Sequence, residues 1–121
     1  MHSRAELGRR GEDLAVAHLL AKGYRVLERN VRSRYGEIDI VALDGDCIVF
    51  IEVRSREFSG VQPEESVTRA KQRRMANLGL AYLQAHHDPG AEWRADVVAV
   101  EFGLDGQPLR LDHHVNAVEE E

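Results

Sequence analysis

This sequence predicts an α/β fold in three layers, with a mixed central sheet flanked by helices. Two segments, residues 3–22 and 68–85, carry apolar residues at helical spacing. Five other segments are rich in β-branched and aromatic residues and lie between Gly, Pro and Asp turn signals. Their order along the chain is α-β-β-β-α-β-β, and 121 residues suit a single domain, residues 1–121.

The first helix, over residues 3–22, has signals at both ends. Ser3 is a suitable N-cap, and Glu6 three residues later completes a capping box. Gly23 is a helix stop signal. The apolar stripe between these ends consists of Leu7, Gly11, Leu14, Ala15 and His18.

Strands are predicted next at residues 24–30, 37–43 and 47–54. Residues 32–36 are a polar loop between the first two, and Asp44-Gly45-Asp46 between the last two indicates a hairpin. A long loop over residues 55–63 precedes the second helix. Two strands follow that helix, at residues 93–102 and 109–114, with a turn at Asp105-Gly106. The acidic tail, residues 115–121, is expected to be frayed.

The composition indicates a cytoplasmic protein with no membrane partner. No apolar run approaches the roughly 20 residues that span a bilayer, and no apolar signal-peptide segment follows the first residues. The one cysteine, Cys47, cannot form an internal disulfide, which suits a reducing compartment. Its place on an apolar strand face predicts a core residue.

Charge is distributed unevenly along the chain. The net charge is −5, but residues 1–74 hold 14 basic and 12 acidic residues, whereas residues 75–121 hold 2 and 9. Arginine, whose planar fork matches phosphate, supplies 14 of the 16 basic residues. One interpretation is a basic face that binds a nucleic-acid backbone, and the other is solvated faces with local ion pairs. The candidate contacts are Arg9, Arg10, Arg32, Arg34, Arg56, Arg73 and Arg74.

The central hairpin carries the sharpest signal. Alternation places Ile38, Ile40, Ala42, Cys47, Val49, Ile51 and Val53 on one buried face. The opposite face carries Asp39, Glu52 and Arg54 at its open end. With a turn at Asp44-Gly45, Asp39 opposes Phe50; with a turn at Gly45-Asp46, it opposes Glu52. Both registers keep the three charged residues on one face.

Two carboxylates this close repel each other unless a positive group lies between them. A divalent cation meets that need, and Mg²⁺ typically takes one or two carboxylates plus waters and a substrate phosphate. Asp39 and Glu52 are therefore candidate metal ligands. The alternative is that Arg54 simply forms an ion pair with Glu52 or Asp39.

Ordered motifs along the chain resemble one known family. They are Gly8-Arg9-Arg10-Gly11-Glu12, Gly36-Glu37-Ile38-Asp39-Ile40-Val41, Phe50-Ile51-Glu52-Val53-Arg54-Ser55-Arg56, Pro63-Glu64-Glu65-Ser66-Val67, Lys71-Gln72-Arg73-Arg74 and Arg94-Ala95-Asp96-Val97-Val98. The set resembles the YraN-like family of small bacterial proteins, within the restriction-endonuclease-like, or PD-(D/E)XK, superfamily. The family is most similar there to archaeal Holliday-junction resolvases.

The resemblance implies the restriction-endonuclease-like fold and a set of catalytic residues. Glu12 matches the acidic residue of the first helix, Asp39 the motif aspartate, and Glu52 the glutamate of E-x-K. Arg54 stands where the superfamily usually has lysine, and arginine stays charged and cannot act as a base. Lys71 on the second helix is a candidate for the missing ammonium group; the alternative for it is a surface role.

Other candidates have weaker signals. For Glu12 the alternative is a solvated carboxylate or an ion pair with Arg9. Glu37 is either a further metal ligand or the partner of Arg34 in a salt bridge. Asp96 suits a backbone cap as well as a site. The adjacent pairs His86-His87 and His113-His114 lack the spacing of a helical zinc site and are expected at the surface. Tyr35, beside Arg34 in the loop before Asp39, is a candidate for stacking on a base, although it is a single aromatic residue.

Three functions remain open. The first is a metal-dependent endonuclease that acts on DNA, branched or structured, with Mg²⁺ or Mn²⁺. The second is a catalytically inactive nucleic-acid-binding module on the same fold, which Arg54 and the net charge favour. The third is an interaction protein that only retains the fold. By analogy with small resolvases, a homodimer is expected.

Overall fold

The computed structural model describes residues 3–58, 69–86, 88 and 90–116. The elements are, in order, α1 (Arg4–Ala21), β1 (Arg25–Ser33), β2 (Gly36–Asp44), β3 (Cys47–Glu57), α2 (Arg69–Ala85), β4 (Trp93–Phe102) and β5 (Pro108–His114). This is the predicted α-β-β-β-α-β-β order. The motif at residues 63–67 and the tail at 117–121 lie outside the described residues.

One mixed sheet organises the fold. Its strand order is β1-β2-β3-β4-β5. The central pair, β3 and β4, is parallel, and the other three pairs are antiparallel. A parallel pair needs a crossover connection, and α2 lies in that connection. Within the described residues, neither helix is long and apolar enough to cross a membrane.

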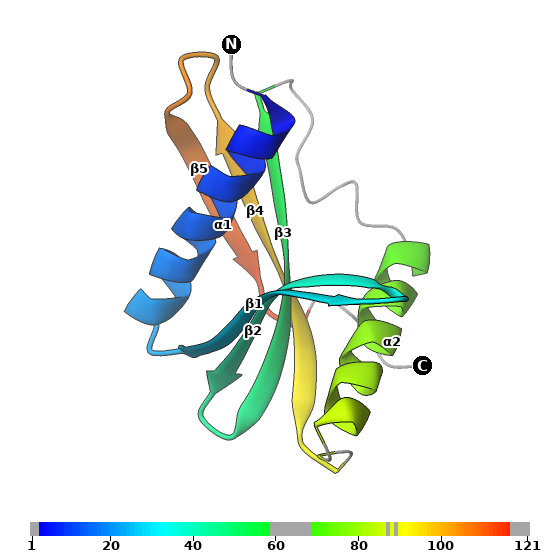
Figure 1. Ribbon diagram of the computed structural model, residues 1–121. Coiled ribbons are helices and arrows are strands. Elements are labelled where there is room, and N and C mark those ends of the chain that lie inside the picture. The colour runs from blue at the N-terminus through cyan, green and yellow to red at the C-terminus, as the bar shows by residue number, and fades with distance from the viewer. Residues whose placement is uncertain (1–2, 59–68, 87, 89, 117–121) are drawn as a thin grey trace.

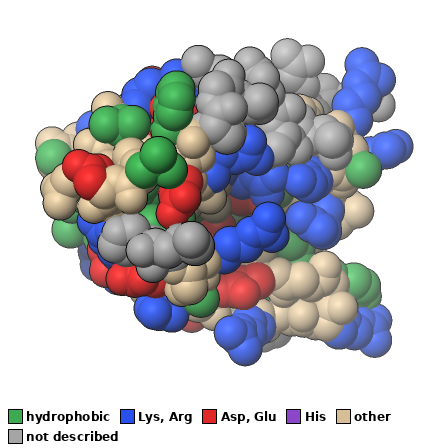
Figure 2. Space-filling model, turned by 90° about the horizontal axis from the view of Figure 1, so that it is seen from above, with side chains coloured by type: hydrophobic (Ala, Val, Ile, Leu, Met, Phe, Trp, Pro, Cys, Tyr) green, Lys and Arg blue, Asp and Glu red, His purple; other side chains and the backbone are tan. Residues whose placement is uncertain are grey.

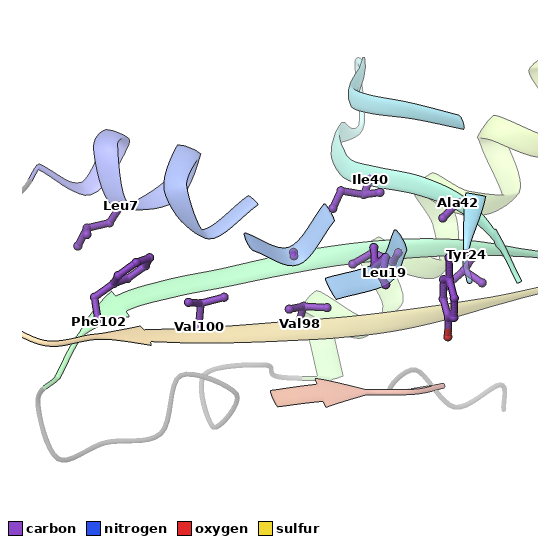
Figure 3. Packing of buried hydrophobic residues seen from close by; sticks show 11 residues of the cluster. Leu7, Leu19, Tyr24, Ile40, Ala42, Val98, Val100 and Phe102 are labelled. Atoms are coloured by element: carbon purple, nitrogen blue, oxygen red, sulfur yellow. The ribbon is translucent and has the colours of Figure 1, made fainter. Parts of the chain in front are cut away.

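The two helices cover opposite faces of the sheet, which gives three layers (Figure 1). On the α1 side, Leu7 and Leu19 pack against a cluster that includes Ile40, Val98 and Phe102 (Figure 3). On the other side, Leu78 and Leu83 of α2 pack against Val41 and Phe50. The core therefore has two halves separated by the sheet, and Cys47 packs at the edge of the α1 half as expected.

Two glycines let the helices approach the sheet closely. A Cβ at Gly11 of α1 would lie 1.8 Å from Ser55 Oγ of β3, and one at Gly79 of α2 would lie 2.6 Å from the ring of Phe50. A side chain at either position would push its helix away from β3. Both helices are thus pressed onto the strand that carries Glu52 and Arg54.

The helix predictions are confirmed, with Ser3 Oγ accepting the N–H of Glu6 at 3.1 Å as the N-cap. Two loop predictions are corrected. Residues 32–36 are not a loop, because β1 continues to Ser33 and pairs with Gly36 around a two-residue turn. The loop predicted at 55–63 begins later, because β3 pairs with β4 as far as Glu57. Hydrogen bonds from neighbouring strands hold these polar residues extended, which composition alone does not reveal.

The predicted apolar face of β2 is broken at Asp39. Ile40 and Ala42 pack on the α1 side, but Ile38 packs on the α2 side with Leu78. Regular alternation would keep Ile38 and Ile40 on one face. The prediction of one buried face over residues 38–42 is therefore wrong for Ile38.

The break coincides with a change of backbone conformation on the neighbouring strand. Asn30 of β1 has a left-handed φ of +55°, and the pairs on either side of it, Arg29–Ile40 and Val31–Ile38, place it opposite Asp39. Beyond this point the hairpin no longer pairs with β3 and extends toward α2 (Figure 1). We call residues 31–38 the hairpin arm.

Candidate active site

The site lies where β2 and β3 part. The turn between them is Gly45-Asp46, because Asp44 pairs with Cys47. This is the register that directs Asp39 toward Glu52, but the paired ladder ends one step earlier, at Ile40–Ile51. Asp39 instead accepts the backbone N–H of Val53 through its side chain, with Oδ2 2.7 Å from the nitrogen. The carboxylate thus replaces a strand-to-strand bond at the split.

Asp39 sits in a partly buried, acidic environment. Burial, together with the charges of Glu52, Glu12 and Glu37, raises the pKa of Asp39 to about 6, although the Val53 N–H opposes the shift. A raised carboxyl pKa beside other carboxylates is typical of functional sites. A cation placed among these groups would restore the ionised form.

Glu52 lies beside Asp39 and is largely enclosed, with 17% of its side chain exposed. Its Oε1 is 3.4 Å from Nη1 of Arg54, so the ion pair expected as the alternative is present. Its Oε2 is buried and has no hydrogen-bond partner in the part of the chain that the structure describes. A buried carboxylate oxygen without a donor is costly, and a bound cation would satisfy it.

Glu12 reaches the split from α1. Its Oε1 accepts from Arg29 Nε at 2.9 Å and from Asn30 Nδ2 at 3.1 Å. The side chain is 13% exposed, and its charge contributes to the raised pKa of Asp39. Glu12 is therefore neither a solvated carboxylate nor a partner of Arg9. Of the three acidic residues implied by the resemblance, Asp39 lies within electrostatic reach of both Glu12 and Glu52.

A pocket opens beside these carboxylates on the α2 side. It is lined by Glu37, Ile38, Asp39, Phe50, Ile51, Glu52, Arg74, Met75 and Leu78. Lys71 is half-buried and lies one helical turn before Met75, on the same side of α2. In Figure 2, Lys and Arg side chains gather around a recess, and acidic side chains lie mostly on the other half of that face.

The candidate arginines differ in their surroundings. Arg10 is half-buried, with its guanidinium 5.0 Å from the ring centroid of Phe102. Arg32 is 83% exposed and 3.9 Å from Glu37, which pairs with it instead of with Arg34. Arg34 stacks on Tyr35. The remaining candidates are the exposed Arg9, Arg73 and Arg74 and the half-buried Arg56.

The donor set fits a magnesium-like cation better than a structural metal. Among the described residues, no three His, Cys, Asp or Glu side chains gather closely enough to hold an ion by themselves. Asp39 has a second oxygen besides the one that holds Val53, and Glu52 has the unpartnered Oε2. One or two carboxylates completed by water and phosphate are the usual Mg²⁺ arrangement.

A second polar cluster lies on the opposite face of the sheet. Asp96 is fully buried and holds Arg94 Nε at 3.1 Å, His113 Nε2 at 2.8 Å and the N–H of Asn116 at 2.8 Å. Burial alone would raise the pKa of Asp96, but these three donors lower it. Asp96 thus caps a backbone group, as one of its two interpretations held.

His113 corrects a prediction, because its side chain is only 4% exposed and not at the surface. It also lies 3.2 Å from His18 on α1. The sequence held a signal for this position, because His113 lies two places after the apolar Leu111 and such residues share one face of a strand. Leu111 packs on the α1 core, and His113 faces the same side. Asn30 was missed as well, and no pattern marks a left-handed asparagine within a strand.

The chain matches one family model, described as "Uncharacterised protein family UPF0102", over residues 11–100. The chain belongs to this family. The UPF0102 protein of Chlorobaculum tepidum is 46% identical over 112 residues, which cover 91% of this chain and 87% of the relative. The UPF0102 protein of Roseiflexus castenholzii is 47% identical over 121 residues, with 97% and 96% covered. The matched span contains Glu12, Asp39, Glu52 and Arg54.

Proposed function

We propose that this UPF0102 protein is a metal-dependent endonuclease of the PD-(D/E)XK type that acts on DNA. The observation that carries the proposal is the pair of carboxylates at the β2–β3 split. Asp39 has a raised pKa, and Glu52 presents a buried oxygen without a donor. The pocket beside them is bordered by Arg74, a cation suited to phosphate.

The roles follow from the geometry. Asp39 and Glu52 would hold a divalent cation, and Glu12 adds negative charge behind them. When bound, such an ion neutralises charge on a phosphoryl group and makes a water easier to deprotonate. Arg74 borders the space where a backbone phosphate would enter.

Arg54 is the distinctive residue of this site. Its guanidinium lies 3.4 Å from Glu52 and can stabilise negative charge that grows on a phosphate oxygen. It cannot take a proton from water. Lys71, half-buried on the same side of α2 as Met75, is the other ammonium candidate. We therefore expect slow cleavage that depends strictly on metal.

The test is a cleavage assay with Mg²⁺ or Mn²⁺ on matched duplex, single-stranded, flap and four-way DNA. Wild type should cut at least one of these, and Asp39→Asn and Glu52→Gln should not. Asp46→Asn, in the exposed β2–β3 turn, is the control and should cut like wild type. Equal cutting by wild type and both site variants would show that another site, or a contaminant, does the chemistry.

A second candidate function is a DNA-binding module without catalysis. Arg54 in the usual lysine position favours it. DNA binding by a wild-type protein that cuts none of the substrates would support this function. Absence of both binding and cleavage would leave the third interpretation, an interaction protein whose carboxylates are structural.

A further inference from the structure

The hairpin arm no longer pairs with β3, but it packs against α2. Val31 and Ile38 pack on the α2 core, and Leu78 lies beneath Gly36, 3.5 Å from where a Cβ would be. The Ser33 hydroxyl accepts the N–H of Tyr35 at 3.2 Å and so fixes the turn. The tip of the arm is therefore ordered in advance, which lowers the entropy cost of binding.

An aromatic ring and a cation are joined at this tip. Arg34 donates from Nη2 to the Tyr35 hydroxyl at 2.6 Å, and its guanidinium lies 4.9 Å from the ring centroid. The tyrosine is 56% exposed, and neither side chain packs into the apolar core. Rings and guanidinium planes are the groups on which proteins stack unpaired bases.

The arm also sets the distance from the tip to the site. Asp39 lies at its root, and Tyr35 lies four residue steps from Asp39, with three residues between them. At about 3.3 Å per residue, the backbone of Tyr35 lies roughly 13 Å along the arm from that of Asp39. At the roughly 3.4 Å rise per nucleotide of a stacked strand, that length corresponds to about four nucleotides, and to fewer where the strand is stretched.

We propose that the Arg34–Tyr35 tip is a stacking platform for an unpaired base a few nucleotides from the phosphate at the Asp39–Glu52 site. Two arginines are available to a DNA strand here, Arg32 on the arm, which is paired with Glu37, and Arg74 at the pocket. A fully paired duplex keeps its bases stacked inside, so the platform selects DNA with an unpaired base. This inference rests on the proposed function, because it takes DNA as the ligand of this pocket.

The test compares affinity for two labelled DNAs, a duplex and the same duplex with a short unpaired stretch, without divalent metal and at fixed salt. Tyr35→Ala should weaken binding to the second DNA about tenfold, as loss of one base–aromatic stack predicts, and leave duplex binding unchanged. Tyr35→Phe should bind like wild type. Phe58→Ala is the control, because Phe58 is equally exposed at 57% but lies just past the end of β3, six residues beyond Glu52.

Each outcome decides the matter. Selective weakening in Tyr35→Ala supports the platform even if no protein cuts DNA, in which case the nuclease proposal fails separately. If wild type cuts DNA and Tyr35→Ala binds both DNAs as Phe58→Ala does, the platform is wrong and the nuclease stands. Equal weakening on both DNAs also overturns it, since the tyrosine would then contact only backbone. Failure of wild type to bind either DNA overturns the platform, and the cleavage assay with metal then decides the nuclease proposal separately.

Discussion

The carboxylate of Asp39 accepts the backbone N–H of Val53 across the split between β2 and β3, with Oδ2 2.7 Å from the nitrogen. This bond lets the two strands separate while the N–H of Val53 keeps an acceptor. It also fixes the orientation of Asp39 beside Glu52. One side chain therefore closes the end of the ladder and supplies a ligand to the proposed cation.

The first prediction concerns stability and pH. Burial raises the pKa of Asp39 from 3.8 to about 6, so between these values the folded chain holds a proton that the unfolded chain has released. The free energy of unfolding therefore falls as pH rises from about 4 to 6. Asp39→Asn, which keeps an acceptor for Val53, should be more stable than wild type at pH 7.5, by about 3 kcal/mol at most. Urea unfolding of both proteins at pH 7.5 and at pH 4 measures the difference in the free energy of unfolding, which should vanish near pH 4. A less stable variant at pH 7.5 would contradict the assignment.

The second prediction concerns metal binding. Wild type should bind Mn²⁺ in a calorimetric titration at pH 7.5, because Asp39 and Glu52 present two converging carboxylates. Glu52→Gln should weaken binding by more than about tenfold, since even outer-shell partners of a metal contribute that much. Asp46→Asn serves as the matched control. Equal affinity in Glu52→Gln and wild type, or no binding in either, would remove the site.

The third prediction concerns Arg54 and is measured by single-turnover cleavage. Arg54→Ala should slow the reaction by about 10²–10³, as for loss of one preorganised charge donor. Arg54→Lys should retain or raise the rate, because it restores an ammonium group. Cleavage by Arg54→Ala at the wild-type rate would reduce Arg54 to an ion-pair partner of Glu52.

The fourth prediction concerns phosphate contacts on α2. DNA affinity of the wild type should fall steeply with salt as counterions are released. Arg73→Gln and Arg74→Gln should each reduce the slope of log K against log salt by about 1. Arg110→Gln, on the far edge strand β5, should leave the slope unchanged. A flat salt response of wild type would exclude the backbone contact altogether.

The fifth prediction concerns Asn30. Its φ of +55° suits glycine, whereas alanine pays about 1–2 kcal/mol in this conformation. Asn30→Ala should therefore be less stable than Asn30→Gly, the reverse of the usual order within a strand. Both lose the bond to Glu12, so the comparison isolates the backbone effect. Thermal unfolding of the two variants decides, and a more stable alanine variant would contradict the left-handed conformation.

Local patterns predicted most of this fold. The signals that predicted the elements act over a few residues: helical periodicity, the Ser3 cap and the Gly45-Asp46 turn. A turn at Gly45-Asp46 also corresponds to one of the two predicted β2–β3 registers, the one that sets Asp39 opposite Glu52. The switch of Ile38 to the α2 side does not, because it depends on the backbone of Asn30 in another strand. The Glu12–Arg29 pair and the buried His113 likewise depend on how α1 lies on the sheet, and no short-range pattern encodes that placement.

Paired strands of this sheet lie either close together or far apart along the chain. The strands β1, β2 and β3 follow one another through two-residue turns, whereas β3 meets its parallel partner only through pairs as distant as Ile48–Trp93. Closing the longer loop takes more entropy, so the three-stranded meander is expected to form first during folding. Until β4 arrives, β3 presents an open hydrogen-bonding edge beside apolar residues such as Val49. Refolding at high concentration should therefore lose material to association through that edge, and dilution should restore the yield.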